Sequence, residues 1–519
     1  MLIRDMLRMT TSRVPNKEAL VMEETSLTYE QLNSRVNRLA HGMLGMSLRK
    51  GDRVAVLTHN NIEYYETYLA LCKIGGVMVP FNNLQREKEF YRDFEYIKPR
   101  FIFFESEFAS MVEKLMARIS SLEKAICIGP AAASDHLPYE SLMEGQNDQE
   151  PDVEVKPDDL MSIFLTSGTT GNPKGVMRTQ HHNALNAMVG AIELGLRPDD
   201  RVLLTFPFYH VTLEDRFCHI LRGNTIVIRK EGSFRAPDVL DLISRHRISV
   251  CQFVPTMLNT LLQDETIDQY DLSALRLILY AAAPMPVALL KKAMARFPTS
   301  GFMQFFGQTE TGPLTITLRP EDHRMETEQD LQRLASCGRP AVHFDVRIVD
   351  EMDQEIPRGE VGELTVRGEA MTIGYWELPE ESEKLLTGGW LHTGDFARQD
   401  EDGFIYIVDR KNDMIISGGK NIYPREVEEV LYSHPAVLEA TIIGVPDPHW
   451  GESVKAIVVL KPGISTTAEE LISFCKENMA SYKKPSTIEF RDILPKSPAG
   501  KILKRVLRDE FWKEQDRKV

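Results

Sequence analysis

The segment from residue 165 to residue 176 reads Leu-Thr-Ser-Gly-Thr-Thr-Gly-Asn-Pro-Lys-Gly-Val and brings together the residue types that bind phosphate. Its glycines let the backbone approach an anion closely and adopt positive φ angles. Successive backbone N–H groups in such a loop form an anion-binding concavity, and Lys174 adds a mobile positive charge. The apolar residues 161–165 predict a buried strand, and phosphate loops usually follow a strand. We therefore expect a loop that holds phosphate groups.

This loop differs from the Walker A type, in which Gly-Lys is followed at once by a Ser or Thr that holds magnesium. Here Lys174 precedes Gly175, and Val176 follows. The alternative interpretation is a solvent-exposed turn rich in Gly, Ser and Thr. Three glycines, a Pro-Lys pair and a preceding buried strand rarely coincide in such a turn, so the phosphate loop is favoured.

The composition limits the classes of protein that fit. A chain of 519 residues exceeds what one hydrophobic core supports, so two or more domains are expected. The formal net charge of −15 argues against a general nucleic-acid binder and against an anionic membrane surface as a partner. The six cysteines are scattered, without a Cys-x-x-Cys pair, which disfavours a zinc site or disulfide framework and fits a reducing, cytoplasmic location. We find no signal peptide and no run of about 18 apolar residues, so stable membrane insertion is not expected.

The hydrophobic pattern predicts the elements that position the loop. A strand at 52–57, a helix at 62–74 and a strand at 77–81 form a βαβ unit. Further buried strands are expected at 101–104, 125–128, 200–204, 225–228, 250–254 and 275–280. Helical stretches separate most of them, so the fold class is α/β with two doubly wound sheet regions.

The pattern changes after about residue 340. Short strands with Gly-rich turns at 344–349, 362–366 and 404–408 predict a small β-barrel or sheet. The charged run 409–413 separates two apolar strands, and we place a domain boundary there. A small α+β domain is expected beyond it, from a helix starting at Pro424, strands at 438–445 and 453–460, and a helix at 468–479. The predicted domains are therefore 1–410 and 411–519, with the second hinged to the first.

Six motifs occur in a fixed order along the chain: Ser167-Gly-Thr-Thr-Gly-Asn-Pro-Lys-Gly175, Phe306-Gly-Gln-Thr-Glu310, Thr393-Gly-Asp395, Asp409-Arg410, Ser417-Gly-Gly-Lys-Asn-Ile-Tyr-Pro424 and Pro498-Ala-Gly-Lys501. With these motifs in register, the chain resembles the adenylate-forming superfamily of acyl-CoA synthetases, peptide-synthetase adenylation domains and luciferases. The resemblance covers nearly the whole length. It implies that a carboxylate attacks the α-phosphate of ATP to give an acyl-adenylate and pyrophosphate, and that a thiol then displaces AMP. Because two anions meet in the first step, electrostatic stabilisation should dominate.

The resemblance also implies roles for individual residues. The loop that closes over the β- and γ-phosphates comprises Thr166, Ser167, Gly168, Thr169, Thr170, Gly171 and Lys174. Adenine would lie between Phe306, followed by Gly307, and a wall formed by Ala282, Ala283 and Pro284. Thr309 would contact the α-phosphate and Glu310 would hold Mg²⁺. Asp395 would accept the ribose hydroxyls and Arg410 would reach the ribose. Taken alone, an Asp after Thr-Gly is usually a turn residue and such an Arg a solvated charge.

The C-terminal motifs carry the remaining roles that the resemblance implies. Lys501 would be the catalytic lysine, which bridges carboxylate and phosphate oxygens during adenylation; the alternative is a surface lysine before a helix at 502–511. Ser417, Gly418 and Gly419 would line the path of the CoA pantetheine, or would form a plain turn. Asn412, where relatives often carry Asp or Lys, would be the hinge. Five basic residues near the C-terminus would either meet the CoA phosphates or form a solvated helix face: Lys496, Lys501, Lys504, Arg505 and Arg508.

The segment 206–211 resembles the acyl-pocket motif of the family, with His210 near the substrate carboxylate and counted among the catalytic residues. The next residues, 212–216, are polar where many relatives are apolar. Glu214, Asp215 and Arg216 either form a substrate-recognition cluster or belong to a helix start, with Thr212 as N-cap and Asp215 three residues on. The helix start is favoured, and the acid is left unnamed.

The leading functional prediction is an ATP-dependent carboxylic acid:CoA ligase with ATP, Mg²⁺ and coenzyme A as cofactors or co-substrates. Its partners would be a small carboxylic acid, ATP and CoA, with no nucleic acid, and a homodimer is compatible with this function. Alternatives are an acyl-AMP ligase that loads a carrier-protein thiol in trans and a non-catalytic ATP-binding regulator. The presence of Lys174, Glu310, Asp395 and Lys501 together argues against the regulator.

Overall fold

The fold is taken from a computed structural model of the chain. It describes residues 1–130, 136–167, 173–230, 232–283, 285–410, 413–496 and 502–512, and at residues 167, 212, 213 and 215 it describes the backbone alone. The α-helices of these ranges are α1 (Ile3–Arg13), α2 (Tyr29–Gly45), α3 (Ile62–Ile74), α4 (Glu87–Ile97), α5 (Ala109–Arg118), α6 (Gln180–Glu193), α7 (Phe217–Arg222), α8 (Ala236–Arg245), α9 (Pro255–Leu262), α10 (Val287–Arg296), α11 (Glu328–Arg333), α12 (Pro379–Leu385), α13 (Pro424–Ser433), α14 (Ala468–Asn478) and α15 (Lys504–Asp509). None of them is long and apolar enough to cross a bilayer.

Two large sheets form the bulk of the molecule. The first runs in the order β7 (Leu137–Pro138), β6 (Lys124–Ile128), β5 (Phe101–Glu105), β3 (Arg53–Leu57), β4 (Val77–Pro80), β8 (Leu160–Ser167), β9 (Pro173–Thr179). The second runs β16 (Arg339–Pro340), β15 (Gly312–Leu318), β14 (Gly301–Gln308), β13 (Leu277–Tyr280), β12 (Val250–Phe253), β10 (Arg201–Leu204), β11 (Thr225–Ile228), β1 (Glu18–Met22), β2 (Thr25–Thr28). Their central strands are parallel and buried, as the continuous apolar runs predicted.

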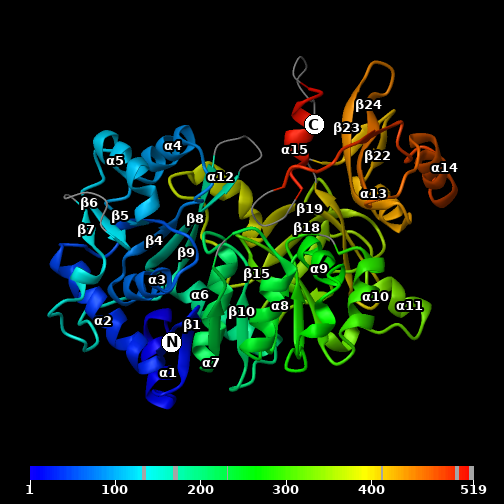
Figure 1. The fold of residues 1–519 in the computed structure, drawn as a ribbon. Coiled ribbons are helices and arrows are strands. Elements are labelled where there is room, and N and C mark those ends of the chain that lie inside the picture. The colour runs from blue at the N-terminus through cyan, green and yellow to red at the C-terminus, as the bar shows by residue number, and fades with distance from the viewer. Residues whose placement is uncertain are drawn as a thin grey trace.

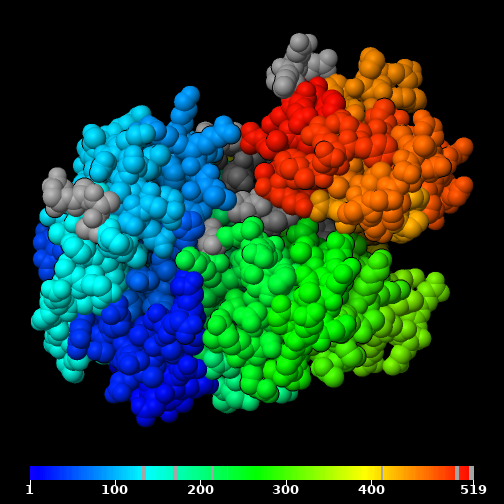
Figure 2. Space-filling view, viewed as in Figure 1, coloured from blue at the N-terminus to red at the C-terminus, as the bar shows by residue number. Residues whose placement is uncertain are grey.

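Two smaller sheets complete the fold. The region expected to form a small β-barrel or sheet is an antiparallel sheet in the order β17 (Asp345–Val349), β18 (Gly362–Arg367), β19 (Leu391–Gln399), β20 (Ile405–Arg410). The C-terminal α+β part contains β22 (Lys420–Ile422), β21 (Ile415–Ser417), β24 (Gly451–Leu460), β23 (Val437–Asp447) and β25 (Thr487–Phe490). Figure 1 shows this part, in orange and red, above the second sheet, with the first sheet, in blue and cyan, beside them. In Figure 2 the surface is hollowed where the three parts meet.

Helix α3 illustrates how the sequence sets the ends of a helix and its burial. The Asn61 side chain accepts a hydrogen bond from the Tyr64 backbone N–H and caps its start, and Gly75, at φ 73°, ends it in the left-handed region. Nearly all of its side chains are buried, so it packs in the interior rather than on the surface. The predicted bounds, 62–74, are therefore those of the structure.

A buried polar cluster joins the two large sheets. Arg178 on β9 and Glu214 are both fully buried, and Arg178 Nε lies 3.3 Å from Glu214 Oε2. The other carboxylate oxygen, Oε1, accepts hydrogen bonds from the hydroxyls of Tyr68 and Ser162 and, at 3.0 Å, from the Asn183 amide. These partners come from α3, β8 and α6, so one carboxylate holds several elements together. Burial raises the pKa of Glu214, while Arg178 and these hydrogen bonds oppose that rise.

Arg178→Met should lower the free energy of unfolding by about 3–5 kcal/mol, because it leaves Glu214 buried without its cation. The double variant Arg178→Met with Glu214→Gln should recover most of this loss, since Gln keeps an oxygen for the three donors and removes the charge. Chemical denaturation measures both. The matched control is Arg367→Met, which breaks the exposed pair with Asp345 and should change stability by less than about 1 kcal/mol. A single variant as stable as the wild type would contradict this account.

Candidate active site

The predicted phosphate loop connects two antiparallel strands. In the β8–β9 hairpin Thr166 lies opposite Lys174, and Ser167 lies opposite Pro173. The predicted loop residues Gly168, Thr169, Thr170 and Gly171 lie outside the described residues. The hairpin nevertheless fixes where the loop begins and ends, because its two flanking residues are paired across the ladder.

Lys174 and Glu310 meet at a tyrosine that the sequence did not single out. Lys174 Nζ lies 2.6 Å from Glu381 Oε2 and 4.8 Å from the centre of the Tyr375 ring. The Tyr375 hydroxyl donates a hydrogen bond of 2.9 Å to Glu310 Oε1. Burial raises the pKa of Tyr375, and the neighbouring Glu310 adds to the rise, so the phenol remains a donor at neutral pH. The cation of the loop and the predicted metal-binding carboxylate therefore belong to one cluster.

Tyr375 reaches this position because its segment pairs with β9. The Trp376 N–H donates to the Gly175 carbonyl at 2.7 Å, and the Met177 N–H donates to the Gly374 carbonyl at 3.0 Å. A long stretch of sequence separates the two segments, and a Tyr in a turn-rich region carries no local signal of a site. Only the pairing of the backbones reveals its role.

The motif 306–310 spans the last three residues of β14 and the start of the turn that leads to β15. A Cβ added at Gly307 would lie 2.2 Å from the Gly312 carbonyl oxygen, so a glycine is required there. The Thr309 carbonyl accepts a hydrogen bond from Arg178 Nη1 at 3.4 Å. Thr309 and Glu310 are half-buried, with part of each residue open to solvent. The buried cluster around Arg178 thus extends to the turn that carries the predicted α-phosphate contact.

Asp395 is joined to that turn and to Arg410. Asp395 and Arg410 face each other on the adjacent strands β19 and β20, and Arg410 Nε lies 2.7 Å from Asp395 Oδ1. The Gln308 amide donates to Asp395 Oδ2 at 2.6 Å. Asp395 is only 2% exposed and lies within a strand, so the alternative of a simple turn residue is wrong. The motif alone predicts no role for Gln308. Its hydrogen bond to Asp395 indicates that it positions that carboxylate.

The two sides of the predicted adenine site lie at the ends of neighbouring strands. Phe306 is half-buried near the end of β14, and Ala282 and Ala283 follow β13, which pairs in parallel with β14. Ala282 is exposed at φ 68°, a conformation uncommon for a residue with a side chain. Strained backbone of this kind is common at ligand sites. Ligands of α/β sheets also commonly bind at the carboxyl ends of the parallel strands. Pro284 lies outside the described residues.

His210 follows a segment that is anchored to the first sheet. The Asn60 side-chain amide donates to the Phe206 carbonyl at 2.8 Å, and the Phe208 N–H donates to Asn60 Oδ1 at 2.9 Å. Burial lowers the pKa of His210 to about 4, so its ring is neutral at pH 7. Its Nε2 is buried without a hydrogen-bond partner among the described residues. A neutral imidazole with a free nitrogen can accept or donate one hydrogen bond to an acid.

The helix-start interpretation of residues 212–216 is wrong. Residues Val211–Arg216 form a 3₁₀ helix, η3, so the backbone of Thr212 lies inside a helical turn and does not precede it. The residue before α7 is Arg216. Glu214 belongs to the buried cluster with Arg178, which removes it from any recognition cluster. Arg216 has no acidic partner among the side chains that the structure describes, and its Nη2 donates a hydrogen bond to Gln252 Oε1.

Two of the residues predicted to line the path of the CoA pantetheine form a turn in the C-terminal part. Gly418 and Gly419 connect β21 to β22 with φ angles of 57° and 75°, the conformation of a two-residue hairpin turn that favours glycine at both positions. The plain-turn alternative thus accounts for both glycines, and a role toward pantetheine stays a prediction. Lys501 and Asn412 lie outside the described residues.

The basic residues near the C-terminus have acidic partners. Lys504 Nζ lies 2.8 Å from Glu428, Arg508 Nη1 lies 3.0 Å from Asp413, Arg505 Nε lies 3.7 Å from Asp509, and Lys496 contacts Glu439. Because each of these four cations has an acidic partner, the pairs argue against a site for CoA phosphates, although Lys504 and Arg508 are half-buried and do not belong to a solvated face. Near them, burial raises the pKa of Asp409 to about 6 while Lys504 opposes the rise.

Glu310 is the predicted metal ligand, and its surroundings limit what it could hold. Within the described ranges, the group with metal-site spacing is His59, Glu105 and Glu107, whose ligand atoms lie within 4.8 Å of one another. These residues lie at the ends of β3 and β5, on the other large sheet. Mg²⁺ in nucleotide sites is typically held by one or two carboxylates together with substrate phosphates. A single carboxylate at 310 therefore suits an ion whose remaining ligands come from a bound nucleotide.

Comparisons with known proteins identify the family to which the chain belongs. The AMP-binding enzyme model matches residues 7–376, and the AMP-binding enzyme C-terminal domain model matches residues 426–501. The chain is 35% identical over 500 residues to feruloyl-CoA synthase of Amycolatopsis sp, covering 96% of each chain. It is also 35% identical over 515 residues to the fatty acid–[acyl-carrier-protein] ligase ScoC of Streptomyces coeruleorubidus, covering 97% of this chain and 95% of that one. The fold matches the crystal structure of the anthranilate CoA ligase AuaEII in complex with anthranoyl-AMP with a TM-score of 0.91 and 29% identity, covering 98% of this chain and 97% of that one. These matches confirm the resemblance that the motifs indicated: the chain belongs to the AMP-binding enzyme family.

Proposed function

We propose that this protein is an ATP-dependent carboxylic acid:CoA ligase that works through an acyl-adenylate. The observation that carries the proposal is the convergence of residues from four of the six motifs on one place. Gln308 and Arg410 hold Asp395, while Tyr375 brings Lys174 next to Glu310. An acceptor for ribose hydroxyls, a cation for phosphate and a carboxylate for a metal ion are what the binding of ATP requires.

The reaction follows in two displacements at this place. A carboxylate oxygen of the acid attacks the α-phosphorus of ATP, the bond to the bridging oxygen of the β-phosphate breaks, and pyrophosphate leaves. The thiol of CoA then attacks the acyl carbonyl, loses its proton, and the C–O bond to AMP breaks. Mg²⁺ bound at Glu310 would neutralise phosphate charge. Lys174 would move from Glu381 to the phosphates, and neutral His210 would hydrogen-bond the acid without repelling or neutralising it.

A carrier-protein thiol is the second candidate acceptor, and a specific observation favours testing it. The relative ScoC is named as a ligase for an acyl carrier protein, at the same 35% identity as the feruloyl-CoA synthase. Both acceptors present a phosphopantetheine thiol, so the adenylation site does not distinguish them. An assay that offers free CoA and a holo-carrier protein in parallel does so directly.

Incubation with ATP, Mg²⁺, a panel of carboxylic acids and CoA should release AMP and pyrophosphate, and should form an acyl-CoA. Chromatography of the nucleotides and mass spectrometry of the thioester measure both products. ADP together with an acyl-phosphate would overturn the proposal. AMP release with transfer only to the holo-carrier would replace CoA by the carrier as acceptor.

Asp395→Ala should raise the KM for ATP and depress turnover, because each lost hydrogen bond to a charged acceptor costs roughly 1.5–3 kcal/mol. The wild type should also discriminate against 2′-deoxy-ATP, whereas the variant should accept ATP and 2′-deoxy-ATP more equally. This second readout separates ribose binding from a general loss of structure. Asp345→Ala, an exposed carboxylate on β17, is the matched control. Undiminished discrimination in Asp395→Ala would exclude the ribose role.

Lys501→Ala should abolish most acyl-adenylate formation, since the lost electrostatic stabilisation is worth several kcal/mol. It should largely spare thioester formation when a synthetic acyl-adenylate is supplied with CoA. Single-turnover measurements of the two half-reactions test this. The control is Lys496→Ala, whose lysine contacts Glu439 and should affect neither half-reaction. Equal damage to both half-reactions by Lys501→Ala would argue against a role confined to adenylation.

A further inference from the structure

Arg216 is a buried cation without an anionic partner among the described side chains. It is 3% exposed, and within the described part of the chain its hydrogen bond goes from Nη2 to the side-chain oxygen of Gln252. A guanidinium cannot lose its proton in a protein, so its charge persists in this interior. Burying such a charge without an anion is costly. The fold therefore maintains an unfavourable arrangement that a bound anion would relieve.

Two neighbouring polar groups are also buried without hydrogen-bond partners among the described residues. Gln252 on β12 is 2% exposed, and its side-chain nitrogen has no hydrogen-bond partner in the described ranges. The hydroxyl of Tyr65 on α3 is likewise buried without a partner that the structure describes. Burial raises the pKa of Tyr65 and the charge of Arg216 lowers it, which places the two groups within electrostatic reach. Guanidinium, amide and phenol are all donors, so the group that satisfies them together must be an acceptor.

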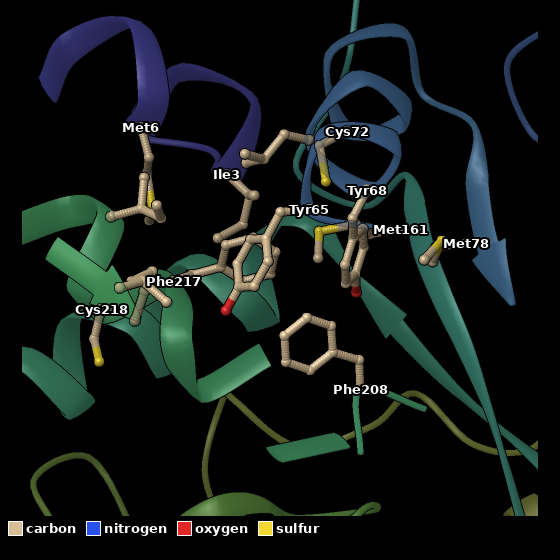
Figure 3. Packing of buried hydrophobic residues seen from close by; sticks show 14 of the residues in the cluster. Ile3, Met6, Tyr65, Tyr68, Cys72, Met78, Met161, Phe208, Phe217 and Cys218 are labelled. Carbon is tan, nitrogen blue, oxygen red and sulfur yellow. The ribbon is translucent and has the colours of Figure 1, made fainter. Parts of the chain in front are cut away.

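Arg216 and Gln252 line a small hollow behind the segment that carries His210, and Tyr65 packs against Phe208 of that segment. A cavity is lined by residues 203–208, Arg216 and Gln252. The rings of Tyr65 and Phe208 have centroids 5.3 Å apart. Figure 3 shows the Tyr65 hydroxyl directed toward the side of Phe208 and Phe217, and Phe217 directly follows Arg216 in the chain. The polar groups thus lie on the inner face between the two large sheets, among aromatic side chains.

This hollow lies within reach of the adenylation site. β12, which carries Gln252, pairs with β13, which leads to Ala282, and β13 pairs with β14, which leads to Phe306. Gln252 is in register with Leu279 and Met303, so Phe306 lies two strand spacings across and three residues along the sheet, roughly 14 Å from Gln252. His210 lies between Phe208 and Arg216 in the sequence. An acid whose reacting carboxylate meets His210 could therefore extend a few bonds toward Arg216.

We propose that Arg216 and Gln252, with the Tyr65 hydroxyl, bind a second carboxylate of the acid substrate, so that the enzyme activates dicarboxylic acids. This inference rests on the proposed ligase function and deepens it. A carboxylate is an acceptor-only anion whose two oxygens match the planar donors of a guanidinium. The aromatic residues around the hollow exclude water, which strengthens the pairing.

Comparison with Arg178 supports the assignment of Arg216 to ligand binding. It is also fully buried, yet it faces Glu214 and takes part in a cluster that holds several elements together. Arg216 has a neutral amide instead. One arginine is balanced within the fold, and the other is balanced by a ligand. Removing each should consequently have opposite effects on stability and on substrate choice.

The test compares straight-chain acids with and without a second carboxylate, such as hexanoate and adipate, over lengths of three to eight carbons. ATP–pyrophosphate exchange gives kcat/KM for each. The wild type should prefer the diacid at its best length by about tenfold or more. Arg216→Met should lose about 10- to 100-fold on the diacid while keeping or improving the monoacid. Gln252→Leu should shift the preference in the same direction by a smaller factor.

Arg222→Met is the matched control, because Arg222 lies on α7 but donates to the Leu196 carbonyl. It should leave the preference for the diacid unchanged. A thermal-shift arm needs no ATP: diacid should raise the melting temperature of the wild type and not of Arg216→Met. The unliganded Arg216→Met protein should melt at or above the wild-type temperature, whereas Arg178→Met should melt lower.

The outcomes separate the inference from the proposed function. If the wild type is active and Arg216→Met has the same ratio of kcat/KM for monoacid and diacid as the wild type, the second-carboxylate site is overturned. The ligase proposal would then stand. Loss of stability in Arg216→Met, without any diacid-induced shift in the wild type, would make Arg216 a structural residue and would also overturn it. If no acid supports exchange, the ligase proposal fails, and the thermal-shift arm still decides whether Arg216 binds a dicarboxylate.

Discussion

The buried ion pair between Arg178 and Glu214 is the interaction on which the site depends. It links the hairpin that carries the predicted phosphate loop to the 3₁₀ helix after His210, and Arg178 also donates a hydrogen bond to the carbonyl of Thr309. Breaking such a pair leaves a charge stranded in a medium that solvates it poorly, so the elements that supply its members are held in register. The predicted phosphate loop, the turn predicted to contact the α-phosphate and the segment that carries His210 are thereby connected through one buried cluster.

The same interior contains a second arginine that serves a different purpose. Arg216 is as deeply placed as a structural residue, but its described partner is only the neutral Gln252. Interior charges that stabilise a fold are paired, whereas an unpaired one is kept at a cost in stability. We therefore interpret the difference between these two arginines as the difference between holding the fold and recognising a ligand.

The sequence motifs are brought together by contacts that the sequence did not predict. The sequence predicts Asp395 as the ribose acceptor but assigns no role to Gln308, whose amide donates a hydrogen bond to Asp395 Oδ2. Tyr375 joins Lys174 to Glu310 only because its segment pairs with β9. Each contact crosses a long sequence separation, and such contacts leave no periodic or local signature. The helix-cap prediction at Thr212 failed for a related reason: a polar run at a predicted helix start looks the same whether its acid caps a turn or is buried against a distant cation.

The sequence by itself determined the secondary elements and the chemistry of the motifs, because these depend on local properties. Apolar runs define the parallel strands, Asn61 and Gly75 limit α3, and the glycines around Lys174 permit a phosphate loop. Tertiary structure alone decided which charges are balanced. Glu214 and Arg216 are two residues apart in the sequence, yet one faces Arg178 and the other a neutral amide. Burial and partners are set by which distant elements pack together, and these are the quantities that separate a structural charge from one that binds a ligand.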